Sequence, residues 1–61
     1  MKRKQFLQDL EKAGCTLLRH GSKHDVYINP ANGKKQPVPR HSEIHNQLVK
    51  HIKKQLGLDF N

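Results

Sequence analysis

The sequence predicts an α+β domain in which a three-stranded antiparallel sheet carries two helices on one face, in the order α-β-β-β-α. Apolar residues recur at helical spacing near both ends of the chain, whereas apolar and polar residues alternate between them. Two turn-forming sequences, GSK and NPANGKK, divide this middle part into three short segments. A three-stranded meander needs one covered face to be stable, and two amphipathic helices supply that cover. We expect residues 1–61 to form this single domain.

The first helix is predicted over residues 3–13. Phe6, Leu7 and Leu10 recur at helical spacing and, with Ala13, give one apolar stripe. Gln, Lys and Glu fill the other positions and favour helix. Gly14 then provides the stop, because a left-handed backbone costs least at glycine.

Two strands are predicted on either side of GSK, where Gly21 permits a tight turn. The first covers residues 15–20, CTLLRH, and the second covers residues 24–29, HDVYIN. In the second strand Val26 and Ile28 point one way, and His24 would share their face. The opposite face takes the alternate residues, Asp25, Tyr27 and Asn29.

A second hairpin is predicted at NPANGKK, which contains the turn pair Asn32–Gly33. The third strand follows at residues 36–40, QPVPR. Pro37 and Pro39 cannot donate ladder hydrogen bonds, so this strand is short or lies at an edge.

The last segment is predicted to be a helix that ends at Gly57. Its apolar stripe consists of Leu48, Val49, Ile52 and Leu56. Either Ser42 or Asn46 could cap its start. We favour Asn46, which leaves Ile44 in a packed turn before the helix.

The charge of the chain favours a polyanionic partner. Twelve Lys and Arg residues against five Asp and Glu residues give a net charge of +7. Such a field on a small body attracts polyanions and speeds their association. Only 33% of the residues are hydrophobic, so the core is thin and a bound partner would add stability by mass action.

Targeting signals and membrane segments are not expected. No apolar stretch follows the basic start, and no apolar run approaches the ~20 residues that span a bilayer. Cys15 is the single cysteine, so an intramolecular disulfide is excluded. We expect a cytoplasmic protein that contains no membrane segment.

Three motifs, taken in order, resemble the HicA family, the toxin halves of bacterial and archaeal HicAB toxin–antitoxin systems. They are GSKHDVYI at the first hairpin, VPRH at the third strand and IKKQLGL near the C-terminus. The resemblance covers nearly all 61 residues. It implies a double-stranded-RNA-binding-like fold, endoribonuclease (mRNA interferase) activity on mRNA, and a HicB antitoxin that binds and blocks the toxin.

The resemblance also implies a catalytic histidine just after the Gly-Ser turn. That position matches His24, with Lys23 in a variable place before it. The chain departs from the family pattern at the inserted-looking NPANGKK and at Asn46–Gln47, where a Gly-Thr or similar pair is common. Neither departure removes His24.

The chemistry of imidazole suits this role. RNA carries its own nucleophile, the 2′-hydroxyl, and a base that removes its proton can start cleavage without a metal. An imidazole with a pKa of ~6.5 is mostly free base at neutral pH. From the residues alone, His24 could instead be a turn residue bonded to the backbone.

Four cations near the two turns and the third strand are candidate phosphate contacts. Lys23, Lys34 and Lys35 can act as point charges, and Arg40 could clamp a phosphate with two hydrogen bonds. The alternative is a set of charged loop side chains in solvent.

Three further residues are candidate RNA contacts, each with a structural alternative. Ser22 could bond a phosphate or shape the turn. Tyr27 could stack on a base or pack among its neighbours. His41 could assist binding, act as a second acid–base group, or be a polar residue at a strand end.

No metal or other cofactor is expected. His20 and His24 are four residues apart, but they flank a turn, and a four-ligand zinc site is not evident. The alternative function is a non-enzymatic RNA-binding module of the same fold. It would have to read about 16 base pairs of duplex, which a 61-residue body can hardly span.

Overall fold

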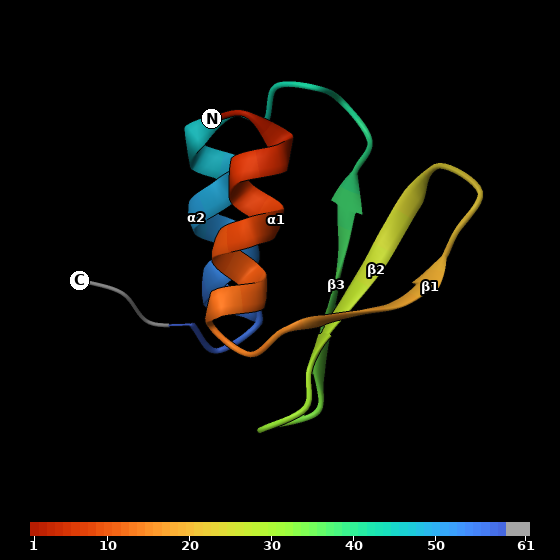
Figure 1. Cartoon of the computed structure of the whole chain (residues 1–61), viewed down its shortest axis with the longest axis vertical. Helices are drawn as coiled ribbons and strands as arrows, with labels where there is room; N and C mark the ends of the chain where they lie inside the picture. Colours follow the sequence, from red (N-terminus) through yellow and green to blue (C-terminus); the bar gives the residue numbers. More distant parts are fainter. Residues whose placement is uncertain (59–61) are drawn as a thin grey trace.

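The computed structural model describes residues 1–58 and has the predicted element order. Helix α1 (Arg3–Lys12) is followed by strands β1 (Thr16–His20), β2 (His24–Asn29) and β3 (Lys34–Pro39), and then by helix α2 (Asn46–Gln55). The strands form one antiparallel sheet in the order β1-β2-β3. Both helices lie side by side on one face of this sheet (Figure 1).

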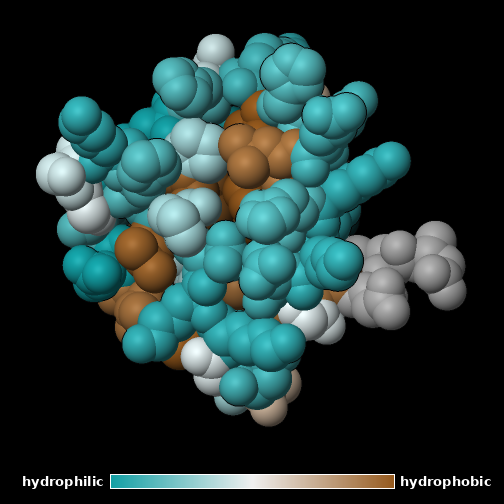
Figure 2. Space-filling view, turned by 180° about the vertical axis from the view of Figure 1, so that it is seen from behind, coloured by the Kyte–Doolittle hydropathy of each residue, from teal (hydrophilic) through white to brown (hydrophobic). Residues whose placement is uncertain are grey.

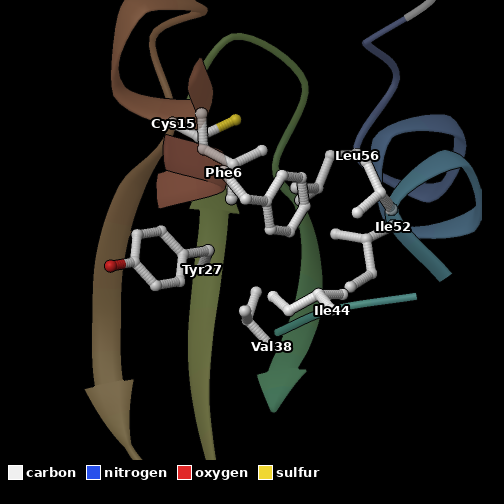
Figure 3. Close-up of a cluster of buried hydrophobic side chains, with 9 residues drawn as sticks. Phe6, Cys15, Tyr27, Val38, Ile44, Ile52 and Leu56 are labelled. Carbon is white, nitrogen blue, oxygen red and sulfur yellow. The ribbon is translucent and has the colours of Figure 1, made fainter. Parts of the chain in front are cut away.

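The core lies between the helices and the sheet. Its buried apolar side chains come from every element except β1: Phe6, Leu10, Cys15, Tyr27, Val38, Ile44, Val49, Ile52 and Leu56. Figure 3 shows the Phe6 ring among the aliphatic side chains of this cluster, with the Tyr27 hydroxyl pointing away from them. Burial raises the pKa of the Cys15 thiol, so this side chain packs as a small apolar group.

Strand β2 is the central strand, and its alternation sets the two faces of the sheet. Asp25, Tyr27 and Asn29 are buried beneath the helices, whereas Val26 and Ile28 are half-buried on the other face. The predicted alternation of residues 24–29 is therefore confirmed. In β1 the register shifts between Leu17 and Arg19, which leaves one extra residue in this edge strand.

Several predicted bounds differ from the observed ones by one or two residues, since α1 ends at Lys12 rather than at residue 13 and β1 begins at Thr16 rather than at residue 15. Strand β3 begins at Lys34 and ends at Pro39, so two lysines belong to the strand and Arg40 lies outside it. The N-cap of α2 is His45 and makes no side-chain cap hydrogen bond, so Asn46 is the first helical residue rather than the cap. The expected packed turn at Ile44 is confirmed, because this residue is only 2% exposed.

Hydrogen bonds connect the ends of both helices to the rest of the fold. The amide of Arg3 donates to the carbonyl of Ser42, and the amide of Ile44 donates to the carbonyl of Met1. At the other end of α2, the side-chain amide of Asn29 donates to the carbonyl of Leu56 over 2.8 Å. The side-chain amide of Asn32 donates to the same carbonyl over 3.1 Å, so two side-chain amides satisfy this helix-end carbonyl. Within residues 1–58 no helix is long and apolar enough to cross a membrane.

Candidate nucleic-acid interface and active site

The turn between β1 and β2 is closed by a short backbone hydrogen bond. The amide of Gly21 donates to the carbonyl of His24 over 2.7 Å. A Cβ atom at Gly21 would lie only 2.7 Å from that same carbonyl oxygen. A side chain at this position would therefore force the backbone to shift, although the φ of Gly21 is not positive.

Replacing Gly21 with alanine is expected to destabilise the domain by about 1–3 kcal/mol, because the added methyl group must push the two strands apart. Thermal unfolding followed by circular dichroism measures the loss. Ser22→Ala, next to it in the same turn, is the matched control and should unfold near the wild-type temperature. Equal stability of both variants would show that the turn has room for a Cβ.

Asp25 is a buried carboxylate that joins four parts of the chain. Its Oδ2 accepts from Nη2 of Arg3 at 2.7 Å, and its Oδ1 accepts from Nδ1 of His20 at 2.8 Å and from Nη2 of Arg40 at 2.9 Å. These partners belong to α1, to β1 and to the segment after β3. Hydrogen bonds from Arg40, and then from His20, hold the pKa of the Asp25 carboxyl well below its usual range.

Arg40 ties this carboxylate to the β1–β2 turn. Its Nε and Nη2 both donate to Oδ1 of Asp25, at 3.1 and 2.9 Å. Its Nη2 also donates to the carbonyl of Gly21 at 2.6 Å, and its Nη1 to that of Ser22 at 3.4 Å. All three nitrogens of the guanidinium are thus engaged within the protein. The expected two-bond clamp on a phosphate is not supported, and the geometry gives Arg40 a positioning role instead.

His24 is the first residue of β2 and its side chain is exposed. Its ladder partner is Pro39, and alternation places its ring on the face of the sheet opposite to the helices. Within residues 1–58 its imidazole makes no hydrogen bond or ion pair. The ring is therefore open to a bound molecule, and within the described residues it makes no hydrogen bond to the backbone of the turn.

The structure separates the predicted RNA contacts into two groups. Ser22, Lys23 and His41 are exposed near His24, at one end of the sheet. Lys34 and Lys35 pair with Asn29 and Ile28, at the other end of the β2–β3 ladder. A separation of four or five residues along a strand is about 13–17 Å. The two turns therefore do not form one cluster.

Tyr27 does not offer a ring for stacking. Its side chain is 7% exposed and lies in the core beneath the helices. Burial raises the pKa of its phenol. The structure has the alternative arrangement, in which Tyr27 packs among its neighbours. The expectation that Tyr27 stacks on a base is therefore not supported.

A comparison with protein-family models matched residues 3–58 to the HicA toxin of bacterial toxin–antitoxin systems. The chain belongs to the HicA family. The resemblance seen in the sequence is therefore confirmed over almost the whole chain. Searches of curated proteins and of solved structures each gave no match.

The surface of this HicA chain is mainly hydrophilic on the side shown in Figure 2, with only small apolar areas. In residues 1–58 no group of three or more His, Cys, Asp or Glu side chains is arranged to hold a metal ion. The positive charge of the chain is carried by its Lys and Arg side chains, which are suited to contacts with a phosphate backbone.

The roles of Asp25, Arg3 and His20 in this HicA chain were missed at the sequence level. One signal could have found Asp25: it is one of only five acidic residues, in a stretch rich in Lys, Arg and His. A carboxylate at an inward position of a strand needs cationic partners when it is buried. Which cations supply them depends on long-range contacts that spacing alone does not give.

Proposed function

We propose that this HicA toxin is a metal-independent endoribonuclease that cleaves mRNA, with His24 as the general base. The observation that supports it is an exposed imidazole, without a protein partner in residues 1–58, on the sheet of a strongly basic domain. Family membership supports a toxin of this kind. Such a substrate would place its action in the cytoplasm.

The proposed step uses the RNA as its own nucleophile. His24 accepts the proton of a 2′-hydroxyl, whose oxygen then attacks the adjacent phosphorus. The bond from phosphorus to the 5′-oxygen of the next nucleotide breaks, and that oxygen takes a proton from water. The hydroxide that remains takes the proton held by His24, which returns the imidazole to its free-base form. The products are a 2′,3′-cyclic phosphate and a 5′-hydroxyl. Nearby cations such as Lys23 would stabilise the charge that develops on the phosphate oxygens.

The product ends and their dependence on metal test this proposal. Purified protein is incubated with end-labelled RNA, with and without a chelator, and the fragments are analysed on a gel and by mass spectrometry. We expect fragments that end in a 2′,3′-cyclic phosphate, in equal yield with the chelator present. Loss of cleavage on chelation would overturn the metal-independent mechanism. RNA that is retarded but never cut would indicate a non-enzymatic RNA-binding module instead.

Membership of a toxin–antitoxin family implies an antitoxin partner. We propose that this partner is a HicB-type protein that covers the His24 surface, since a nuclease acting on cellular mRNA must be masked. The net charge of +7 suits an acidic partner. Co-expression of a small acidic protein encoded beside this chain should restore growth and stop cleavage, whereas continued cleavage in the purified complex would contradict masking.

A further inference from the structure

The face of the sheet that the helices leave uncovered, here called the open face, is defined by strand alternation. Asp25, Tyr27 and Asn29 point towards the helices, so the residues between them and their ladder partners lie on the opposite side. The open face consists of Thr16 and Arg19 of β1, His24, Val26 and Ile28 of β2, and Lys35, Pro37 and Pro39 of β3.

We propose that the RNA strand lies across this open face rather than against the helices, with Arg19 and Lys35 as phosphate contacts. This inference rests on the proposed function in that it takes RNA as the ligand. Val26 and Ile28 form a half-buried apolar floor between the two cations. Such a floor can take the sugars and bases of a single strand while the cations hold its phosphates.

The length of the open face fits several nucleotides. Along β2, His24 and Ile28 are four residues apart, a distance of about 13 Å. A stacked strand rises about 3.4 Å per nucleotide, so about four nucleotides fit between the ends of this row. Arg19 lies opposite Val26, midway along the row, and Lys35 lies opposite Ile28, at the end far from His24. A strand with its scissile phosphate at His24 would therefore pass both cations.

The distribution of charge favours the open face over the helix side. None of its strand positions carries a carboxylate. The acidic residues of the described chain lie elsewhere: Asp9 and Glu11 in α1, Asp25 beneath the helices, and Glu43 before α2. A phosphate on the open face meets cations without these nearby repulsions. The ring of His24 also emerges on this face, so a reacting phosphate must approach it there.

Two neighbouring lysines provide the matched test. Lys34 and Lys35 are both exposed, but Lys35 pairs with Ile28 on the open face and Lys34 pairs with Asn29 on the helix side. In a His24→Ala background, which prevents cleavage, the Kd for a fluorescent single-stranded RNA is measured by anisotropy at several salt concentrations. Lys35→Gln and Arg19→Gln should each weaken binding about fivefold or more and lower the salt slope by about 0.7.

Two lysines away from the open face serve as controls in the same experiment. Lys34→Gln and Lys50→Gln, which remove the same charge from the helix side and from α2, should change Kd by less than about twofold. Losses at Lys34 or Lys50 that equal or exceed those at Lys35 and Arg19 would overturn the proposal. All four positions are exposed, so thermal unfolding should confirm that every variant remains folded.

Methyl signals give a second readout that needs no charge variant. On addition of RNA, the methyl groups of Val26 and Ile28 on the open face should shift, and those of Leu48, which is exposed on α2, should not. The reverse pattern would place the RNA on the helices.

The outcomes separate this inference from the proposed function. If wild-type protein cuts no RNA but the Lys35 and Arg19 variants still weaken RNA binding, the proposed nuclease activity is wrong and the open face remains a binding surface. If cleavage depends on His24 but the methyl and charge effects lie on the helix side, the nuclease survives and this inference fails.

Discussion

Replacing His24 with alanine is expected to lower the rate of RNA cleavage by about 10²–10⁴-fold, the usual contribution of a positioned general base. The fold should be retained, because the His24 side chain is exposed and makes no hydrogen bond within the described residues. RNA affinity should change little, since the phosphate contacts proposed above are lysine and arginine side chains.

Single-turnover cleavage of a labelled RNA measures this loss directly, with anisotropy reporting binding by the same samples. His51→Ala is a suitable control, because His51 is an exposed histidine on α2, away from the β1–β2 turn. Imidazole added to the buffer should partly restore cleavage to His24→Ala, since a small base can enter the space of the missing ring. A His24→Ala protein that cuts RNA at the wild-type rate would remove His24 from the mechanism.

The pattern of strands and helices was predictable because local chemistry determines most of it. Alternation in HDVYIN predicted β2 at residues 24–29, and the structure has the same bounds. Gly14 and Gly57 have positive φ values of 95° and 75°, where glycine is the residue that ends a helix most easily. These features depend on neighbours in the sequence, so a single chain suffices to predict them.

The arrangement of the candidate site was less predictable because it depends on contacts between distant parts of the chain. Arg40 was expected to reach outward to a phosphate, but its donors are directed to Asp25 and to the turn. Lys34 and Lys35 were expected to act together, but adjacent strand residues point to opposite faces once the strand begins at Lys34. The register of β3 was needed to separate them.

Replacing Asp25 with asparagine is expected to cause the largest loss of stability among the polar variants of this domain. Both carboxylate oxygens accept hydrogen bonds, Oδ2 from Arg3 and Oδ1 from Arg40 and His20. An asparagine of the same shape has one acceptor and one NH₂ group, so at least one arginine would face a donor. The side chain is nearly buried, and the two guanidinium groups would lose the negative charge that compensates them.

Thermal and urea unfolding of Asp25→Asn measure this loss, with Asp9→Asn as the matched control. Asp9 is a half-buried residue of α1 whose carboxylate accepts an exposed hydrogen bond from the side chain of Gln5, so its loss should be small. The single-partner variant His20→Ala should fall between the two, because both arginines still hold the carboxylate. Equal unfolding midpoints for Asp25→Asn and Asp9→Asn would show that the network adds nothing to stability.

The dependence on pH separates the charge of Asp25 from its shape. The folded-state pKa of Asp25 lies well below the value of about 3.9 expected in the unfolded chain. The ionised carboxylate therefore adds stability that is fully present above the unfolded-state pKa and is lost as the pH falls towards the folded-state pKa. Asparagine does not titrate, so the stabilities of wild type and Asp25→Asn should converge as the pH falls below about 4. A stability difference that stays constant down to pH of about 2 would mean that the carboxylate acts by its shape and not by its charge.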